Sequence, residues 1–204
     1  MHQKDHPKHE RTLVIIKPDG IQRGLIGEII KRYERSGLKL VAMKMLVPTA
    51  ELVEKHYTID PEWMRLAGEK SLKNALEKGT KPMADEPVAL GRIILDSLKR
   101  YFTAGPVVAM VWEGIHSVEI TRKLTGTTEP LSSDVGTIRG DFVIDSYRVS
   151  SVGGRAIRNL VHASGSPSEA ASEIKIWFTP EEVVNYTHIQ EKILYDVNLD
   201  GILE

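Results

Sequence analysis

Apolar runs separated by polar turns predict that the core of this chain is built on a β-sheet. Residues 12–16 are rich in β-branched side chains and predict a central strand. Residues 106–112 form a continuous apolar run, which is typical of a strand buried on both faces. Residues 38–46 alternate between apolar and polar positions, which predicts another strand. We expect the last main strand at residues 142–144, followed by a loop or hairpin insertion at residues 146–156.

Apolar residues recur at helical spacing between these strands. We expect helices at residues 27–35, 49–57, 117–124 and 180–186, and another from residue 167 onward. The helix from residue 167 has a marked start, because Ser166 and Glu169 have the spacing of a capping box and Pro167 takes the favoured first position. Its apolar face consists of Ala170, Ile174, Trp177 and Phe178.

The order of these elements predicts an α+β fold, a split βαββαβ antiparallel sheet with helices on one face. Residues 58–104 add an inserted helical segment, with helices expected at residues 62–77 and 88–102 and glycine and proline breaks between them. We expect this insertion to decorate a single domain at residues 11–204, which follows a flexible polar tail at residues 1–10.

Composition removes several classes of function. The chain has 204 residues, and 27 lysines and arginines against 28 acidic residues give a net charge of −1. This balance offers no bulk attraction to nucleic acid or to a membrane surface. No cysteine is present, which excludes disulfides, thiolate metal sites and a cysteine nucleophile. Neither a signal peptide nor an apolar run of membrane-spanning length is found, so we expect a cytoplasmic protein.

His162 is the strongest candidate for chemistry. It stands just before the helix that Ser166 caps, where backbone N–H groups and the helix dipole favour negative charge. Glu173 lies two turns into the same helix, within reach of the imidazole. A histidine held by a carboxylate beside an anion site suits a nucleophile that accepts a phosphoryl group. On its own, a histidine at this position is more often a polar loop residue.

Three basic residues on separate predicted elements, Lys17, Arg122 and Arg139, would suit a phosphate-rich ligand. Lys17 ends the first strand, because the Pro18-Asp19-Gly20 that follows cannot continue a central ladder. Arginine is suited to bidentate phosphate contact. Each of the three, considered alone, is equally well explained as a solvated surface charge. Only their occurrence together points to a phosphate-rich ligand.

Three sequence segments carry a more specific signal. They read Lys17-Pro18-Asp19-Gly20-Ile21-Gln22-Arg23-Gly24, Gly136-Thr137-Ile138-Arg139-Gly140-Asp141-Phe142 and Asn159-Leu160-Val161-His162-Ala163-Ser164. In this order they closely resemble the signature segments of the nucleoside diphosphate kinases. The resemblance covers about residues 11–57 and 104–186. The segment between Tyr57 and Gly105, and a second stretch before His162, are longer than is usual in that family.

The resemblance implies a ferredoxin-like fold and an enzyme that transfers the γ-phosphoryl group of a nucleoside triphosphate, typically ATP, to a nucleoside diphosphate. His162 would carry the group as a pros-phosphohistidine, which gives ping-pong kinetics. The implied partners are ATP and other NTPs, NDPs and dNDPs, and further copies of the chain in a homo-oligomer. Mg²⁺ would be held by the nucleotide phosphates, with no metal site on the protein. Neither a membrane nor a specific nucleic acid is expected as a partner.

The resemblance also assigns roles to matching positions. Arg122, Thr128 and Arg139 would hold the β- and γ-phosphates. Lys17 and Asn159 would bind the 3′-hydroxyl of the sugar, and Lys17 would also be a catalytic residue beside His162 and Glu173.

The remaining assignments concern the nucleophile and the rest of the nucleotide. Glu173 would orient the His162 ring and fix its tautomer, and Ser164 would add a hydrogen bond. Tyr57 corresponds to a tyrosine near the sugar, and a partly buried core aromatic is the alternative. The candidates for stacking on the base are Trp63, Tyr101 and Phe102, none of which the sequence singles out.

Two other functions compete with an active kinase. One is a regulatory protein that binds nucleotides and has lost turnover, although all the matching site residues are present. The other is a nucleic-acid-binding module on the same fold, which the near-neutral charge disfavours. The insertion at residues 58–104 is expected to form a subunit contact or a lid over the nucleotide, because loops of this length are usually functional.

Overall fold

An antiparallel sheet of four strands, in the order β2-β3-β1-β4, is the frame of the molecule. The computed structural model describes residues 9–77, 79, 81–196 and 198. The strands are β1 (Arg11–Ile16), β2 (Lys39–Leu46), β3 (Val107–Glu113) and β4 (Val161–Ala163). The helices are α1 (Pro18–Gln22), α2 (Ile26–Glu34), α3 (Ala50–Tyr57), α4 (Trp63–Glu77), α5 (Pro87–Phe102), α6 (Ser117–Thr125), α7 (Ile138–Phe142), α8 (Tyr147–Val152), α9 (Pro167–Trp177) and α10 (Glu191–Leu194).

The two inner strands are buried on both faces, as their apolar sequences predict. All seven residues of β3 and five of the six residues of β1 are buried. Their pairing runs from Arg11 opposite Glu113 to Ile16 opposite Val108. β1 also pairs with β4, which places the end of β1 beside the residues that the sequence singles out for chemistry. The strand order confirms the predicted ferredoxin-like α+β fold.

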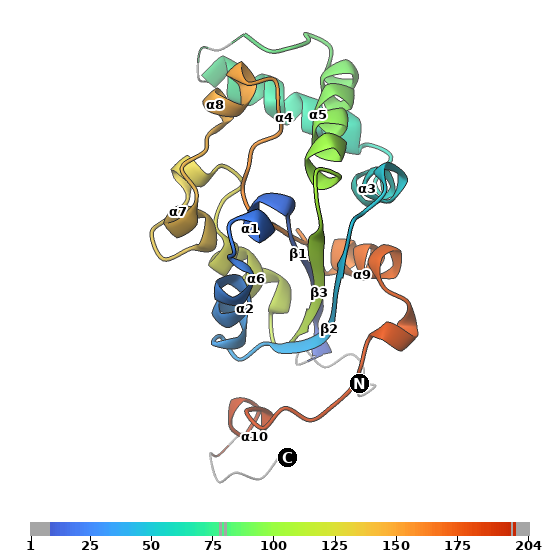
Figure 1. Ribbon diagram of the computed structural model, residues 1–204, viewed down its shortest axis with the longest axis vertical. Helices are drawn as coiled ribbons and strands as arrows, with labels where there is room; N and C mark the ends of the chain where they lie inside the picture. The colour runs from blue at the N-terminus through green and yellow to red at the C-terminus, as the bar shows by residue number, and fades with distance from the viewer. Residues whose placement is uncertain (1–8, 78, 80, 197, 199–204) are drawn as a thin grey trace.

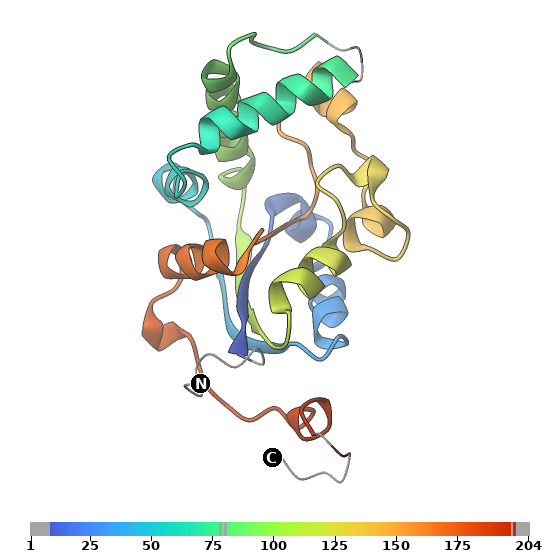
Figure 2. The same cartoon turned by 180° about the vertical axis from the view of Figure 1, so that it is seen from behind.

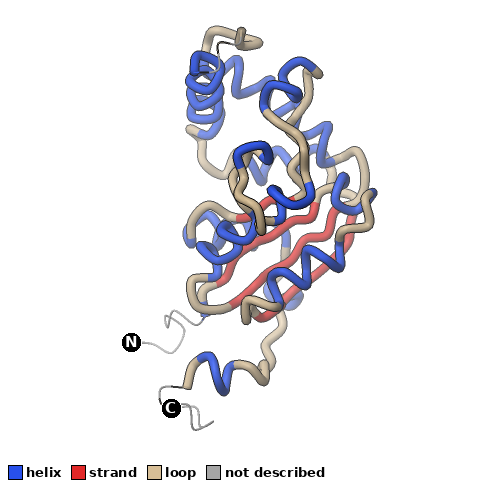
Figure 3. Tube along the Cα trace, turned by 90° about the vertical axis from the view of Figure 1, so that its left-hand side faces the viewer, coloured by secondary structure: helices blue, strands red, loops and turns tan. Residues whose placement is uncertain are grey.

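Helices cover both faces of this sheet, which corrects the prediction of helices on one face. Val14 and Ile16 of β1 share a core cluster with Ile29 of α2, on the face that α2 and α6 cover. Leu13 of the same strand shares a second cluster with Trp177 of α9, on the face that α3 and α9 cover. Figures 1 and 2 show these helices on opposite sides of the sheet, and Figure 3 shows the strands side by side. Because nearly all residues of β1 and β3 are buried, the sheet needs helices on both faces.

The inserted segment forms two closely packed helices at one end of the sheet (Figure 1). α4 and α5 lie within one residue of the predicted bounds. They meet at two glycines: a Cβ added at Gly68 would lie 1.8 Å from the Pro87 carbonyl oxygen, and one added at Gly91 would lie 2.0 Å from the Met64 carbonyl oxygen. α5 leads through a short turn into β3, so the pair is connected directly to a central strand.

Three local predictions were wrong: the helix expected at residues 180–186 is only a 3₁₀ turn at Pro180–Glu182, and two segments before His162 also differ from expectation. Residues 142–144 form no strand, because the chain there leaves helix α7, which Thr137 begins by accepting a hydrogen bond from the Gly140 amide. The last strand is β4 instead, directly at His162. The predicted loop at residues 146–156 contains helix α8, which Ser146 caps through the Val149 amide. Short apolar runs do not distinguish a strand from a helix end, and capping decided both cases.

Of the tail predicted at residues 1–10, residues 1–8 lie outside the described part of the chain. Glu10 is tied to the domain, because its carboxylate accepts a hydrogen bond from the Val118 amide at the start of α6. Toward the other end, Glu191 of α10 forms an ion pair with Lys39, which Glu113 also neutralises. Among the described residues, no helix has the length and apolar character needed to cross a membrane.

The close contact at Gly68 gives a test of this packing. We expect Gly68→Ala to force α4 and α5 apart, because the new methyl group would overlap the Pro87 carbonyl. The cost should be about 1–3 kcal/mol in the opening of this helix pair, read from amide hydrogen exchange over residues 63–102. Gly27→Ala in α2, where an added Cβ meets nothing within 4 Å, is the control and should change nothing there. Unchanged exchange in Gly68→Ala would contradict the described contact.

Candidate functional site

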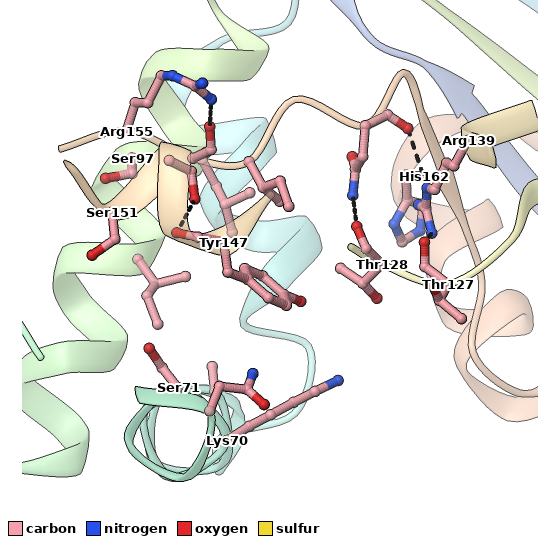
Figure 4. Close-up of a pocket in the computed structure, with 18 of the residues that line it drawn as sticks. Lys70, Ser71, Ser97, Thr127, Thr128, Arg139, Tyr147, Ser151, Arg155 and His162 are labelled. Atoms are coloured by element: carbon pink, nitrogen blue, oxygen red, sulfur yellow. Dashed lines mark hydrogen bonds between the residues drawn. The ribbon is translucent and has the colours of Figure 1, made fainter. Parts of the chain in front are cut away.

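The predicted site residues gather around one pocket of about 770 Å³, between the end of the sheet and the inserted helices (Figure 4). Its lining is strongly cationic for a chain of net charge −1. The basic lining residues are Lys17, Lys70, Lys81, Arg122, Lys123, Arg139, Arg148 and Arg155. Asp134 is the acidic residue among the described lining. Such a pocket favours a ligand with several negative charges.

His162 lies on β4, opposite Ile15 of β1, and its side chain is 13% exposed. Its Nε2 atom is 2.9 Å from the Glu173 Oε1 atom, a close contact that does not have hydrogen-bond geometry, and Nε2 has no other partner among the described residues. The contact with the carboxylate makes Nε2 the protonated nitrogen of a neutral ring. Nδ1 is then the nitrogen with a free lone pair.

Glu173 is held firmly behind the ring. Its side chain is 2% exposed, and its Oε2 atom accepts a hydrogen bond of 2.6 Å from the Ser164 hydroxyl. That hydroxyl oxygen in turn accepts a hydrogen bond from the Leu13 amide of β1. Burial raises the pKa of the Glu173 carboxyl group. The predicted contacts of Glu173 with His162 and of Ser164 with this group are therefore both present.

Sequence reasoning missed His56, a buried residue of α3. Its ring packs edge-on against that of His162, with centroids 4.4 Å apart, and its Nδ1 atom lies 3.5 Å from Glu173 Oε1. Trp177 of α9 donates its indole N–H to the same Nδ1 atom over 3.2 Å, which fixes the proton of His56 on Nε2. Burial lowers the pKa of His56 to about 3. The only sequence signal was its place beside Tyr57 on a predicted helix.

Lys17 and Asn159 form a buried chain that reaches the pocket wall. The Lys17 ammonium donates to Asn159 Oδ1 over 2.7 Å, and the Asn159 amide group donates to the Thr128 carbonyl over 2.9 Å. Burial, and then the charge of Arg139, lower the pKa of Lys17 to about 7. The ammonium also lies 5.2 Å from the Tyr101 ring centroid and 5.3 Å from that of Phe102. Both rings therefore lie within cation–π distance of the ammonium group.

Arg139 holds the backbone around His162 through hydrogen bonds to four carbonyl groups. Its Nε and Nη2 atoms donate to the carbonyls of Asn159 and Val161, on either side of Leu160. Leu160 has a φ of 64°, a left-handed conformation that is strained for a leucine. Nη1 donates to the carbonyls of Gly126 and Thr127, so four of the five guanidinium N–H donors are engaged and one is left for a ligand.

The other predicted binding residues also line the pocket. Arg122 and Thr128 are exposed there, while Tyr57 is partly buried and lies 5.3 Å from Trp63, measured between ring centroids. Of the three aromatics considered for stacking on a base, Trp63 lines the pocket, whereas Tyr101 and Phe102 are not among its lining residues.

The electrostatic setting keeps the His162 imidazole neutral. Burial, followed by the positive charges of Lys17 and Arg139, lowers its pKa to about 3, although the nearby Glu169 acts in the opposite direction. A neutral imidazole has the lone pair that a nucleophile needs. The ring is also close to an acceptor for its N–H proton, because Glu173 is the adjacent carboxylate.

His56, His162 and Glu173 offer ligand atoms within 4.8 Å of one another, the spacing of a possible metal site. Two imidazole nitrogens make this cluster unsuited to Mg²⁺, which prefers oxygen ligands. The hydrogen bonds from Trp177 to His56 and from Ser164 to Glu173 already occupy these groups. His56 and Glu173 are therefore best described as hydrogen-bonded groups that pack around the His162 ring.

The shifted pKa of Lys17 predicts a pH dependence of stability. Between about pH 7 and its ordinary pKa of 10.5, the amine is protonated in the unfolded chain and neutral in the folded one. The free energy of unfolding therefore increases with rising pH over this window. Below about pH 7 the folded protein pays the full penalty of burying the charged ammonium group. Lys17→Met lacks this group. The free energy of unfolding from urea titrations should therefore rise with pH in the wild type relative to the variant. A difference that does not change with pH would contradict the buried position of the amine.

Comparison with known proteins places this site in a family. A family model described as nucleoside diphosphate kinase matches residues 10–67 and 88–183. The nucleoside diphosphate kinase of Pyrobaculum aerophilum is 52% identical over 179 residues, which cover 86% of this chain and 98% of that relative.

Solved structures agree with the sequence match. A crystal structure of an NDP kinase from Pyrobaculum aerophilum has a TM-score of 0.83 and 49% identity, covering 87% of this chain and 100% of that one. A transition-state mimic of the nucleoside-diphosphate kinase from Borrelia burgdorferi, with bound vanadate and ADP, has a TM-score of 0.72 and 38% identity, covering 90% of this chain and 95% of that one. This chain therefore belongs to the nucleoside diphosphate kinase family.

Proposed function

We propose that this protein is an active nucleoside diphosphate kinase that passes the γ-phosphoryl group of a nucleoside triphosphate to a nucleoside diphosphate through Nδ1 of His162. One observation carries the proposal. A neutral imidazole, with Nε2 against the buried Glu173 carboxylate, lines a pocket with eight basic residues. A relative from Borrelia burgdorferi was solved with ADP and vanadate, ligands of the size and charge that such a pocket suits.

The reaction takes place in two half-reactions. In the first, the Nδ1 lone pair of His162 forms a bond to the γ-phosphorus, and the bond from that phosphorus to the bridging oxygen breaks, so the nucleoside diphosphate leaves with the bonding electrons. The Nε2 proton stays on the ring, where the Glu173 carboxylate stabilises the positive charge that develops. In the second half-reaction an acceptor diphosphate takes the group back by the reverse steps. Both nucleotides thus use one site in turn.

The surrounding residues bind and align the nucleotide. Arg122 and the remaining N–H of Arg139 hold the phosphates, together with the Thr128 hydroxyl. Lys17 and Asn159 are preorganised by their own hydrogen bond and meet the 3′-hydroxyl of the sugar. Tyr57 packs beside the sugar, at the wall where Trp63 lies 5.3 Å away between ring centroids.

Mg²⁺ would bind at this site through the phosphates of the nucleotide and not through protein ligands. A dedicated protein cage needs several carboxylates, and Asp134 is the acidic group among the described lining residues. The nucleotide phosphates then supply the oxygen ligands. When bound, the ion neutralises charge on the transferring phosphoryl group.

The proposed unit is one domain over residues 11–204, with residues 58–104 as an inserted wall of the nucleotide site. A cytoplasmic location stays a prediction.

We further propose that the chain acts as a homo-oligomer. Two sets of exposed apolar side chains support this assembly. The edge strand β2 and the residue that follows it expose Met43, Met45 and Val47. A second set, in the segment that contains α7 and α8, consists of Leu131, Val135, Ile144, Val149 and Val152.

Light scattering on the purified protein tests the assembly. We expect a mass that is a multiple of the 22.8 kDa chain. Met43→Lys with Met45→Lys should shift the equilibrium toward smaller species, because the charges would be buried at the edge of the sheet. Leu76→Lys, at a side chain 83% exposed on α4, is the control and should leave the mass unchanged. A wild-type mass of one chain at micromolar concentration would overturn the proposal.

The phosphohistidine gives the direct test of function. Incubation with γ-labelled ATP and Mg²⁺ should label the wild type with an acid-labile, base-stable phosphoryl group that added GDP removes. His162→Ala should take no label, because Nδ1 is lost. His188→Ala, a change outside the pocket lining, is the matched control and should be labelled like the wild type. Wild-type protein that binds ATP without becoming labelled would be a regulatory nucleotide binder, whereas label retained in His162→Ala would move the nucleophile elsewhere.

A further inference from the structure

Lys70 lies on the inserted helix α4, outside the segments that carry the family signature. We infer that its ammonium group binds the phosphates of the nucleotide from across the pocket, as an additional binding residue of the proposed kinase site. This inference rests on the proposed function and deepens it, since it gives the insertion a part in the chemistry of substrate binding.

The position of the side chain is the first argument. Lys70 lines the same pocket as His162, Thr128 and Arg139. Figure 4 shows its side chain extended from α4 into the space between that helix and the opposite wall, which carries Thr127 and Thr128. The phosphate-binding groups and Lys70 therefore face one space from two sides.

The charges along α4 are the second argument. Glu69 accepts a hydrogen bond of 2.6 Å from Arg65, and Glu77 lies 3.9 Å from Lys73, so these acidic residues are paired along the helix. Lys70 forms no ion pair within the described part of the chain, and the other charged residues of the pocket lining are basic except Asp134. A cation in that setting gains from an anion that enters the pocket.

The rigidity of the wall is the third argument. Contacts at Gly68 and Gly91 hold α4 tightly against α5. α5 is fixed in turn to α3 by a hydrogen bond of 2.6 Å between Lys99 and Glu54. Gly68 is only two residues from Lys70, so the backbone that carries the lysine is fixed, and only its side chain has to be ordered when a ligand binds.

The binding of three ligands separates a phosphate contact from other roles. Calorimetry with ADP, AMP and adenosine should show that Lys70→Ala weakens ADP binding by about tenfold, AMP binding less, and adenosine binding not at all. Lys70→Arg keeps the charge and should recover most of the ADP affinity. Lys73→Ala, on the same helix with a side chain 77% exposed, is the matched control and should bind all three ligands like the wild type.

Each other outcome overturns the inference. Equal weakening for all three ligands would assign Lys70 to the base or to the fold, and unchanged ADP binding would make it a solvated surface lysine. Failure of the proposed function is distinguishable, because these measurements need no turnover. If the wild-type protein binds ADP but takes no label from ATP, the kinase function is overturned. The calorimetry on the Lys70 variants then still tests the phosphate contact. Absence of ADP binding in the wild type would overturn both.

Discussion

The contact between His162 and the buried carboxylate of Glu173 is the interaction on which the rest of the site depends. A free histidine presents either nitrogen and takes a proton near neutral pH. Here burial and neighbouring cations keep the ring neutral, and the carboxylate on one side directs the other nitrogen toward the pocket. A carboxylate at this depth would be costly unless another group held it, and the Ser164 hydroxyl does so by donating a hydrogen bond to Glu173.

The fold places these groups with little freedom. His162 and Ser164 come from β4 and the residue after it, and both are tied to the central strand β1. Glu173 comes from α9, whose Trp177 fixes His56 on α3. The strained Leu160 turns the chain into β4, and Arg139 holds the carbonyls on both sides of it. The strain is thus located directly before β4, the strand that carries His162.

Sequence predicted the frame and most of the site, for identifiable reasons. The apolar strands, the Thr49 and Ser166 caps and the signature segments each depend on local chemistry that a sequence displays. The second covered face of the sheet depends on tertiary packing, which overrides local pattern. The role of His56 arises because α3 and α9 pack on the same face, a relation that no spacing along the chain encodes. Lys70 escaped notice for the same reason, since only the folded insertion turns it toward the pocket.

The state of the His162 ring tests the central claim most directly. Nitrogen-detected NMR of the protein labelled with ¹⁵N-histidine, assigned with His162→Ala, reports both the tautomer and the protonation of the ring. We predict a neutral imidazole with the proton on Nε2 and a bare Nδ1, unchanged from about pH 8 to about pH 5, because burial lowers the pKa of this ring to about 3. An imidazolium form at about pH 6, or a proton on Nδ1, would contradict the view that Glu173 prepares His162 as a nucleophile.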